Sequence, residues 1–167
     1  MATVLGIDPG SRFTGWGIVR ASGNELHHIA HGVLKLGNKA MELRLREIHI
    51  GVSNLITENE VDRFAIESSF VSDNPQTAIK LGQARGVAIA AAAVQDLTVA
   101  EYAPREIKQA TVGSGRATKE QVQYMVKVLL NLKEAPDADS ADALAVAICD
   151  LHASRYQSSI DRGLQPR

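Results

Sequence analysis

The chain has 167 residues, with 45% hydrophobic and 22% charged side chains and a formal net charge of −1. This length and composition are typical of one globular domain with a buried core, and they exclude a globally disordered chain. The charge balance indicates no partner by itself, so a surface for nucleic acid would need positive charge gathered in one region.

The sequence offers neither an internal disulfide nor a membrane span. Its single cysteine, Cys149, lies in an apolar, alanine-rich run, where we expect it to pack in the core rather than act as a nucleophile. The longest apolar run, residues 86–94, is far too short to cross a bilayer. We therefore expect a cytoplasmic protein with no membrane partner.

The first predicted element is a short buried strand that ends in an acid. Apolar side chains dominate residues 4–7, Gly6 lets a neighbour approach closely, and a Pro-Gly turn follows Asp8. A carboxylate at the end of a core strand is costly unless it is paired, hydrogen-bonded or bound to a metal. Asp8 is therefore either an acceptor for the N–H groups of the turn or part of a functional site.

The same pattern recurs further along the chain. Residues 13–19 and 26–36 are predicted to continue an antiparallel meander, because the turns between these runs are short. Residues 41–56 have the spacing of an amphipathic helix. A compact strand over residues 61–66 then ends in Glu67, and strand ends of this kind gather into sites in open sheets.

A long helix is predicted over residues 74–95. The side chains on its surface are unusually small, with Gly82 and Gly86 followed by a run of alanines. This surface either packs within the monomer or lets a second copy approach as a dimer interface. Lys80 and Arg85 are the charged residues of the helix, so its exposed part is basic and is a candidate for DNA binding.

The next part of the chain is predicted to be basic. A strand over residues 97–102 leads into a short helix, and a capping box at Thr118 opens another helix. Residues 105–134 contain six Lys and Arg against three Glu, a local positive excess in a slightly acidic chain. The candidate contacts to nucleic acid in this region are Lys108, Arg116 and Lys119.

The last predicted helix begins after Pro136 and carries two more acids. Asp139 and Asp142 are three residues apart, so they point from one face, although the helix dipole also favours acids in a first turn. The neighbouring alanines have small side chains, which would let that face pack closely against a sheet. We expect the domain to span residues 1–157, and the polar tail over residues 158–167 to be disordered.

Four carboxylates are thus candidates for one site. They are Asp8, Glu67, Asp139 and Asp142. Oxygen donors without Cys or His select Mg²⁺ or Mn²⁺ over Zn²⁺. Four acids held together would raise one another's pKa values unless cations occupied the site, and two ions about 3.5–4 Å apart could clamp a phosphodiester. Periodicity alone does not bring these acids together, and each acid taken singly also fits a structural role.

The ordered motifs of the chain resemble those of a known family. They are Gly6-Ile-Asp8-Pro-Gly10, Ala65-Ile-Glu67-Ser68, Lys80-Leu-Gly-Gln-Ala-Arg85-Gly86, Tyr102-Ala-Pro104, Val112-Gly113 and Asp139-Ser-Ala-Asp142-Ala-Leu-Ala. Over nearly the whole chain they resemble bacterial RuvC, the family of Holliday-junction resolvases. The resemblance implies a ribonuclease-H-like α/β fold, in which helices flank a five-stranded mixed sheet made of an antiparallel meander plus parallel strands.

The resemblance also implies an activity and partners. A homodimer would nick four-way junction DNA in pairs, by Mg²⁺-dependent hydrolysis that leaves 5′-phosphate and 3′-hydroxyl ends, with Mn²⁺ able to substitute. The same enzyme would act in recombination and repair together with the RuvA–RuvB branch-migration complex.

The resemblance assigns roles residue by residue. Metal binding, with two ions per site, falls to the four acids, and junction binding and catalysis fall to Lys108 and Lys119. Phe70 follows the second acid, where the family has an aromatic residue that stacks on a base; plain core packing is the alternative for Phe70. Asp73 departs from the pattern, because an acid in this loop is awkward against DNA.

Two other functions fit parts of the sequence. A non-catalytic nucleic-acid-binding module would account for the basic residues but would leave the acids without a purpose. An ATPase of the actin-like class also opens with a Gly-Ile-Asp strand, but it needs two related lobes and a second phosphate loop, for which this chain is too short.

Overall fold

The computed structural model describes residues 1–68 and 74–163, with side chains as far as Tyr156. Every strand and helix predicted from the sequence is present, with shifts of a few residues at the ends. In chain order the described elements are β1 (Ala2–Asp8), β2 (Phe13–Ser22), β3 (Glu25–Lys35), α1 (Met41–Glu58), β4 (Arg63–Glu67), α2 (Pro75–Ala93), β5 (Thr98–Tyr102), α3 (Pro104–Val112), α4 (Lys119–Leu129) and α5 (Ala138–Gly163).

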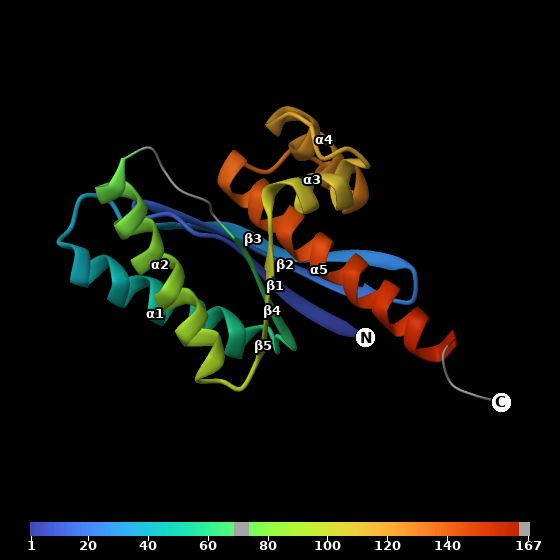
Figure 1. The fold of residues 1–167 in the computed structure, drawn as a ribbon, viewed down its shortest axis with the longest axis horizontal. Coiled ribbons are helices and arrows are strands. Elements are labelled where there is room, and N and C mark those ends of the chain that lie inside the picture. The colour runs from blue at the N-terminus through green and yellow to red at the C-terminus, as the bar shows by residue number, and fades with distance from the viewer. Residues whose placement is uncertain (69–73, 164–167) are drawn as a thin grey trace.

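The described strands form one five-stranded sheet in the order β3-β2-β1-β4-β5 (Figure 1). β2 pairs antiparallel with both β1 and β3, whereas β4 lies parallel between β1 and β5. The predicted meander with added parallel strands is therefore confirmed. Because β1 and β4 are parallel neighbours, their carboxyl ends lie side by side.

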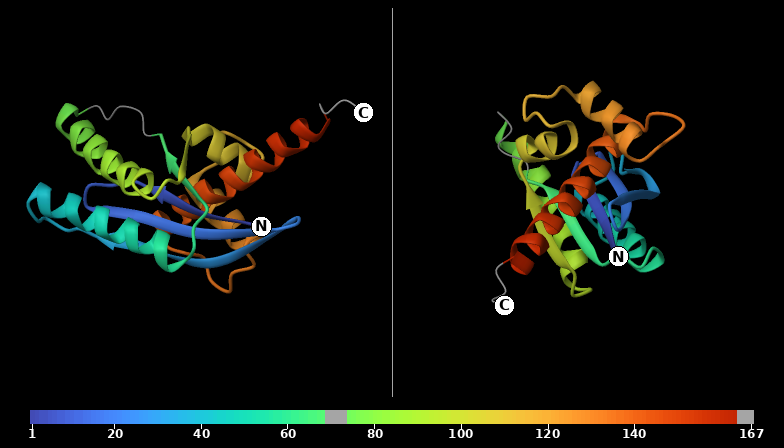
Figure 2. Two further views of the ribbon diagram at one scale, coloured as in Figure 1. Left: turned by 90° about the horizontal axis from the view of Figure 1, so that it is seen from below. Right: turned by 90° about the vertical axis from the view of Figure 1, so that its right-hand side faces the viewer.

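Helices cover both faces of the sheet. α1 and α2 lie together on one face, and α5 crosses the other face with α3 and α4 packed on its outer side (Figures 1 and 2). Successive side chains of β1 point to opposite faces of the sheet, so the strand contributes to both cores. Leu5 and Ile7 pack under α1 and α2, whereas Val4 packs under α5.

α5 lies directly on β1 and β2 because glycines face it. A Cβ atom added to Gly6 would overlap the backbone of Ala143, and one added to Gly15 would overlap the backbone of Asp139. A Cβ atom on Gly17 would collide with the side chain of Leu144. The close approach that the sequence predicted at Gly6 is therefore confirmed, and α5 is the element that makes it.

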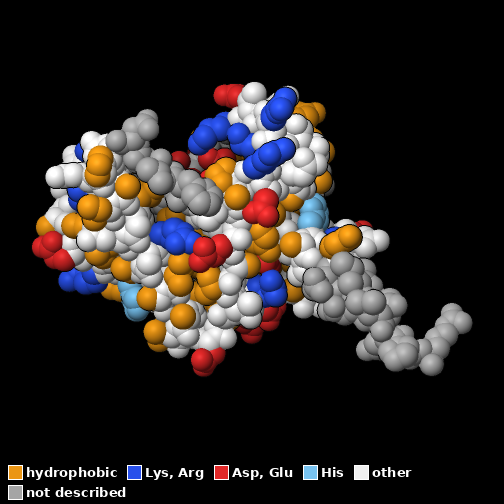
Figure 3. Space-filling view, viewed as in Figure 1, with side chains coloured by type: hydrophobic (Ala, Val, Ile, Leu, Met, Phe, Trp, Pro, Cys, Tyr) orange, Lys and Arg blue, Asp and Glu red, His pale blue; other side chains and the backbone are white. Residues whose placement is uncertain are grey.

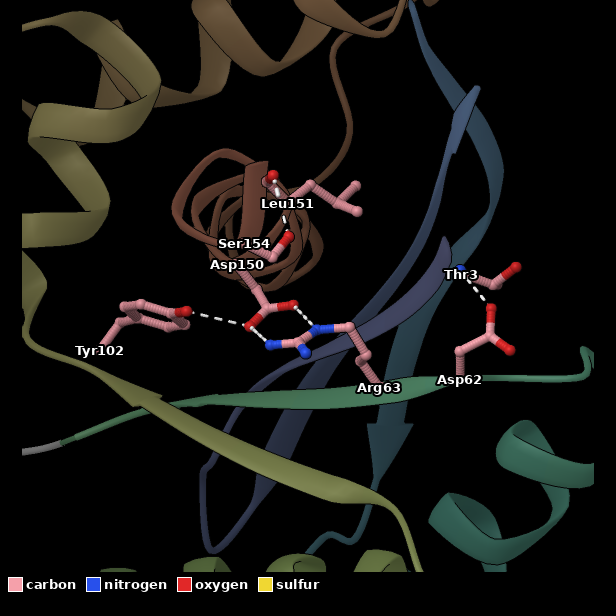
Figure 4. Close-up of polar contacts among 7 residues, drawn as sticks. All are labelled: Thr3, Asp62, Arg63, Tyr102, Asp150, Leu151 and Ser154. Carbon is pink, nitrogen blue, oxygen red and sulfur yellow. Dashed lines mark hydrogen bonds and ion pairs between the residues drawn. The ribbon is translucent and has the colours of Figure 1, made fainter. Parts of the chain in front are cut away.

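A buried ion pair ties α5 to the other half of the sheet (Figure 4). Asp150 of α5 is fully buried and accepts two hydrogen bonds from Arg63 of β4, with N···O distances of 2.7 and 2.9 Å. The hydroxyl of Tyr102 on β5 donates to the same carboxylate at 2.9 Å. With both oxygens of Asp150 satisfied, the carboxylate connects α5 to two strands.

The end of the chain differs from its prediction. α5 continues to Gly163, past the expected domain end at residue 157, because no glycine or proline interrupts the helix before that point. Residues 164–167 lie outside the described part. Cys149 is buried, as predicted, and none of the described helices is both long and apolar enough to span a membrane.

Candidate active site

Two acids lie at neighbouring strand ends on the face that α5 covers. Asp8 is the last residue of β1, and Glu67 is the last residue of β4. The parallel register pairs Ile7 with Ile66, so the next residue of each strand is Asp8 and Glu67. Since Gly6 contacts α5 and side chains alternate along a strand, Asp8 points to the same side.

Helices close a pocket over these strand ends. Its volume is about 230 Å³. The charged residues that line it are Asp8, Glu67, Lys108, Lys119 and Asp142, and its apolar wall is Pro104, Ile107 and Val122. Figure 3 shows acidic side chains recessed below Lys and Arg side chains over α3 and α4. Three of the four predicted acids and both predicted lysines therefore meet in one place.

The buried acids of the pocket hold their protons more tightly than usual. Burial, together with the negative charges of Glu67 and Asp142, raises the pKa of Asp8 to about 7. Burial followed by the charge of Asp142 also raises the pKa of Glu67. The positive charge of Lys119 opposes both shifts without cancelling them. The pocket thus carries more negative charge than its lysines neutralise.

Lys119 is the internal counter-ion of the pocket. It is the first residue of α4, directly after Thr118, whose side chain caps the helix in the predicted capping box. Its ammonium group donates to a carboxylate oxygen of Asp142 at 2.9 Å. The pKa of Lys119 is raised first by this hydrogen bond and then by the charge of Asp142. Cap and ion pair together hold the ammonium over the acids.

Asp139 stands beside the pocket rather than in its lining. Its backbone lies over Gly15 in the first turn of α5, and its charge adds to those that raise the pKa of Asp8. In residues 1–68 and 74–163, no three His, Cys, Asp or Glu side chains are arranged closely enough to hold one metal ion. The acids therefore share a region, but they do not form a tight cluster.

Several predicted contacts lie outside this pocket. Lys80, Arg85 and Arg116 do not line it, and Arg85 forms an ion pair with Glu101 of β5, which offsets its charge. Phe70 and Asp73 lie outside the described residues. Sequence reasoning also missed the apolar wall, although the amphipathic pattern of α3 and α4 could have indicated it.

The donor set fits a hard divalent cation. All the acids offer oxygen, with no thiolate or imidazole in the pocket, which matches Mg²⁺ or Mn²⁺. The raised pKa values of Asp8 and Glu67 point the same way, because a nearby cation would favour the charged carboxylates.

The mixed sheet, with helices on both faces and acids at adjoining strand ends, places the chain in the ribonuclease-H-like fold class. The yeast mitochondrial Holliday junction resolvase Ydc2 shares this fold, with a TM-score of 0.69 and 11% identity over 98% of this chain and 86% of that one.

Within that class, the chain belongs to the RuvC family. The model of the crossover junction endodeoxyribonuclease RuvC matches residues 4–150. RuvC of Serratia proteamaculans is 53% identical over 98% of this chain and 94% of its own length. RuvC of Idiomarina loihiensis is 51% identical over 93% and 90%. The structure of Thermus thermophilus RuvC in complex with Holliday junction substrate has a TM-score of 0.89 and 33% identity, and the match covers 94% of this chain and 97% of that one.

Proposed function

We propose that this protein resolves Holliday junctions by paired, symmetric, metal-dependent nicks in recombination and DNA repair. The observation that carries the proposal is the pocket in which Asp8, Glu67 and Asp142 from distant parts of the chain meet Lys108 and Lys119. Membership of the RuvC family supports the same substrate, since the T. thermophilus relative is seen with a Holliday junction.

The four acids would hold the metal. Asp8, Glu67 and Asp142 line the pocket, and Asp139 lies one helical turn from Asp142. When bound, two Mg²⁺ ions would supply Lewis acidity to the scissile phosphate and lower the pKa of the attacking water, and Mn²⁺ would substitute. Hydrolysis would leave a 5′-phosphate and a 3′-hydroxyl.

The lysines would bind the DNA backbone. Lys119 now donates to Asp142, and with the acids compensated by cations its ammonium would donate to a phosphate oxygen instead. Lys108 of α3 lines the same pocket and adds a second positive charge. Lysine suits this role because its ammonium is a compact charge with several donors.

The junction itself suggests the assembly. A four-way junction presents two equivalent strands, so a two-fold homodimer would place one site at each. The exposed, small-sided face of α2 supports a dimer contact, because Cβ atoms added to Gly82 and Gly86 would meet no other atom within 4 Å. We further propose that the dimer works in the cytoplasm with the RuvA–RuvB complex.

The test is cleavage of a synthetic four-way junction compared with linear duplex, with and without Mg²⁺. The wild type should nick the junction only with the cation, and Asp142→Asn should still bind the junction but lose cutting by at least about a hundredfold. Cleavage that survives in Asp142→Asn, or that needs no cation, would contradict the proposed metal site.

Binding without cutting by the wild type would instead support the non-catalytic module, and tight ATP binding without junction binding would support the actin-like alternative. Lys133→Ala is a suitable control, since this exposed lysine lies outside the pocket.

A further inference from the structure

An exposed aromatic side chain stands beside the acidic pocket. Phe13 is the first residue of β2 and follows the short turn after Asp8. Its side chain is 53% exposed, although it begins a strand whose later residues are largely buried. A single exposed apolar ring is common on a protein surface, so what lies beside Phe13 decides its role.

The register of the sheet shows which way Phe13 points. Asp8 is opposite Gly15 in the antiparallel pair of β1 and β2. Gly15 and Gly17 both face α5, and alternation therefore places Phe13 on the same face. Diagonal neighbours of this kind are about 7–8 Å apart, within reach of an aromatic ring. Phe13 thus lies on the side of the sheet that carries Asp8.

The first turn of α5 does not reach Phe13, whose side chain stays exposed. The helix begins at Ala138, and the backbone of Asp139 sits over Gly15. Phe13 is two residues further towards the end of the strand, beyond the first turn of the helix. Phe13 is not part of the pocket lining, but it lies on the same face of the sheet as Asp8 and diagonally across from it.

A positive charge accompanies the ring. Lys35 of β3 is opposite Phe13 in the register and is exposed, and no ion pair involves Lys35 among the residues that the structure describes. The turn is also fixed, because the backbone carbonyl of Arg12 accepts from the N–H of Leu36 at 2.9 Å. The ring and the ammonium group are therefore presented side by side from a rigid strand end.

We propose that Phe13 stacks on an unstacked nucleobase next to the scissile phosphate, and that Lys35 binds a neighbouring phosphate of the same strand. An aromatic ring with a cation beside it is a combination that binds single-stranded nucleic acid, since each nucleotide offers a base to stack on and one negative charge. This inference rests on the proposed function and adds a base contact on the β2–β3 side, opposite the lysines of α3 and α4.

Binding of a four-way junction without Mg²⁺ tests the stack. Phe13→Leu, which keeps an apolar side chain but removes the ring, should weaken binding about tenfold, whereas Phe13→Trp should retain it. The slope of log K against log salt concentration should stay unchanged in Phe13→Leu. In Lys35→Ala its magnitude should decrease by about the amount expected for one lost phosphate contact. Tyr156→Leu is the matched control, because Tyr156 is 72% exposed at the far part of α5.

A base analogue locates the contact. With 2-aminopurine next to the cut, the wild type and Phe13→Trp should quench its fluorescence, and Phe13→Leu should not. If Phe13→Leu binds, quenches and cuts like the wild type, or loses no more affinity than Tyr156→Leu, the stack is refuted. The proposed function survives that result, because wild-type cleavage in the same assay tests it separately.

Discussion

Asp8 shows how one side chain can require an outside partner. Burial is the largest cause of its pKa near 7, and the charges of Glu67 and Asp142 add to it. A purely structural carboxylate at a turn would instead be stabilised by local N–H donors and would have a lowered pKa. A bound cation would relieve the unfavourable position of Asp8, as the proposed metal site requires.

This position predicts how metal-free stability depends on pH. Because folding raises the pKa of Asp8 from 3.8 to about 7, its favourable contribution is complete below pH 3.8 and is lost as the pH rises through about 7. In EDTA at about pH 8, Asp8→Asn should melt several degrees above the wild type, and the gap should narrow towards about pH 5.

Thermal melts with and without Mn²⁺ check this prediction. Added Mn²⁺ should raise the Tm of the wild type but leave that of Asp8→Asn nearly unchanged, because the variant lacks one donor. A pH-independent difference between the two proteins, or an equal gain with Mn²⁺, would show that Asp8 carries no such charge.

At the scale of elements, α5 decides the geometry of the site. Asp139 and Asp142 lie in its first turns, and its register on the sheet is set at two points. Glycines on β1 and β2 fix how closely the helix approaches, and the Asp150–Arg63 pair fixes it against β4 (Figure 4). β4 begins at Arg63 and ends at Glu67. The ion pair that joins Arg63 to α5 therefore also fixes where Glu67 lies relative to the acids of α5.

Removal of one partner of this pair should destabilise the protein. Asp150→Leu leaves the half-buried Arg63 without a counter-ion and should lower the free energy of unfolding by about 3 kcal/mol. Arg63→Met combined with Asp150→Leu should recover most of the loss, because no buried charge then remains. Chemical denaturation of the two single variants and the double variant measures the coupling.

Asp62→Asn is the control for that cycle. Asp62 is exposed and accepts a hydrogen bond from the backbone N–H of Thr3 at 2.8 Å, and its replacement should cost well under about 1 kcal/mol. Additive effects of the Arg63 and Asp150 changes would mean that the pair does not hold α5 in place.

At the scale of the whole molecule, α2 has an exposed face made of small and apolar residues. Gly82 and Gly86 are exposed, and the large apolar side chain of Ile79 on the same helix is 62% exposed. A second copy of the chain could approach closely along this face. Two copies related by a two-fold axis would then carry two acidic pockets for the two equivalent strands of a junction.

A charged side chain at the centre of this face should separate the copies. Gly86→Arg has open space in the monomer and improves helix propensity, so the fold should persist while sedimentation shows a monomer. The variant should make single nicks but lose paired resolution. Asn54→Arg, at an exposed position of α1, should leave the dimer intact; a Gly86→Arg protein that still sediments as a dimer would exclude α2 from the interface.

Local patterns predicted much of the fold and part of the site. The short apolar runs in residues 4–7 and 61–66 were enough to place an acid at two strand ends, because an apolar run and the acid that ends it are local features of the sequence. The capping box at Thr118 was equally readable, and its hydrogen bonds are present. The extent of α5 was less readable, since a polar helix over residues 158–163 resembles a disordered tail.

The sequence by itself determined the elements, the acids that end them and the basic character of the region after β5. Only the tertiary structure decided which of these residues meet. Strand order and the approach of α5 put Asp142 in the pocket and Asp139 beside it, placed Lys119 on Asp142, and paired Arg85 with Glu101. These outcomes depend on contacts between segments far apart in the chain, and the periodicity of a single segment carries no information about them.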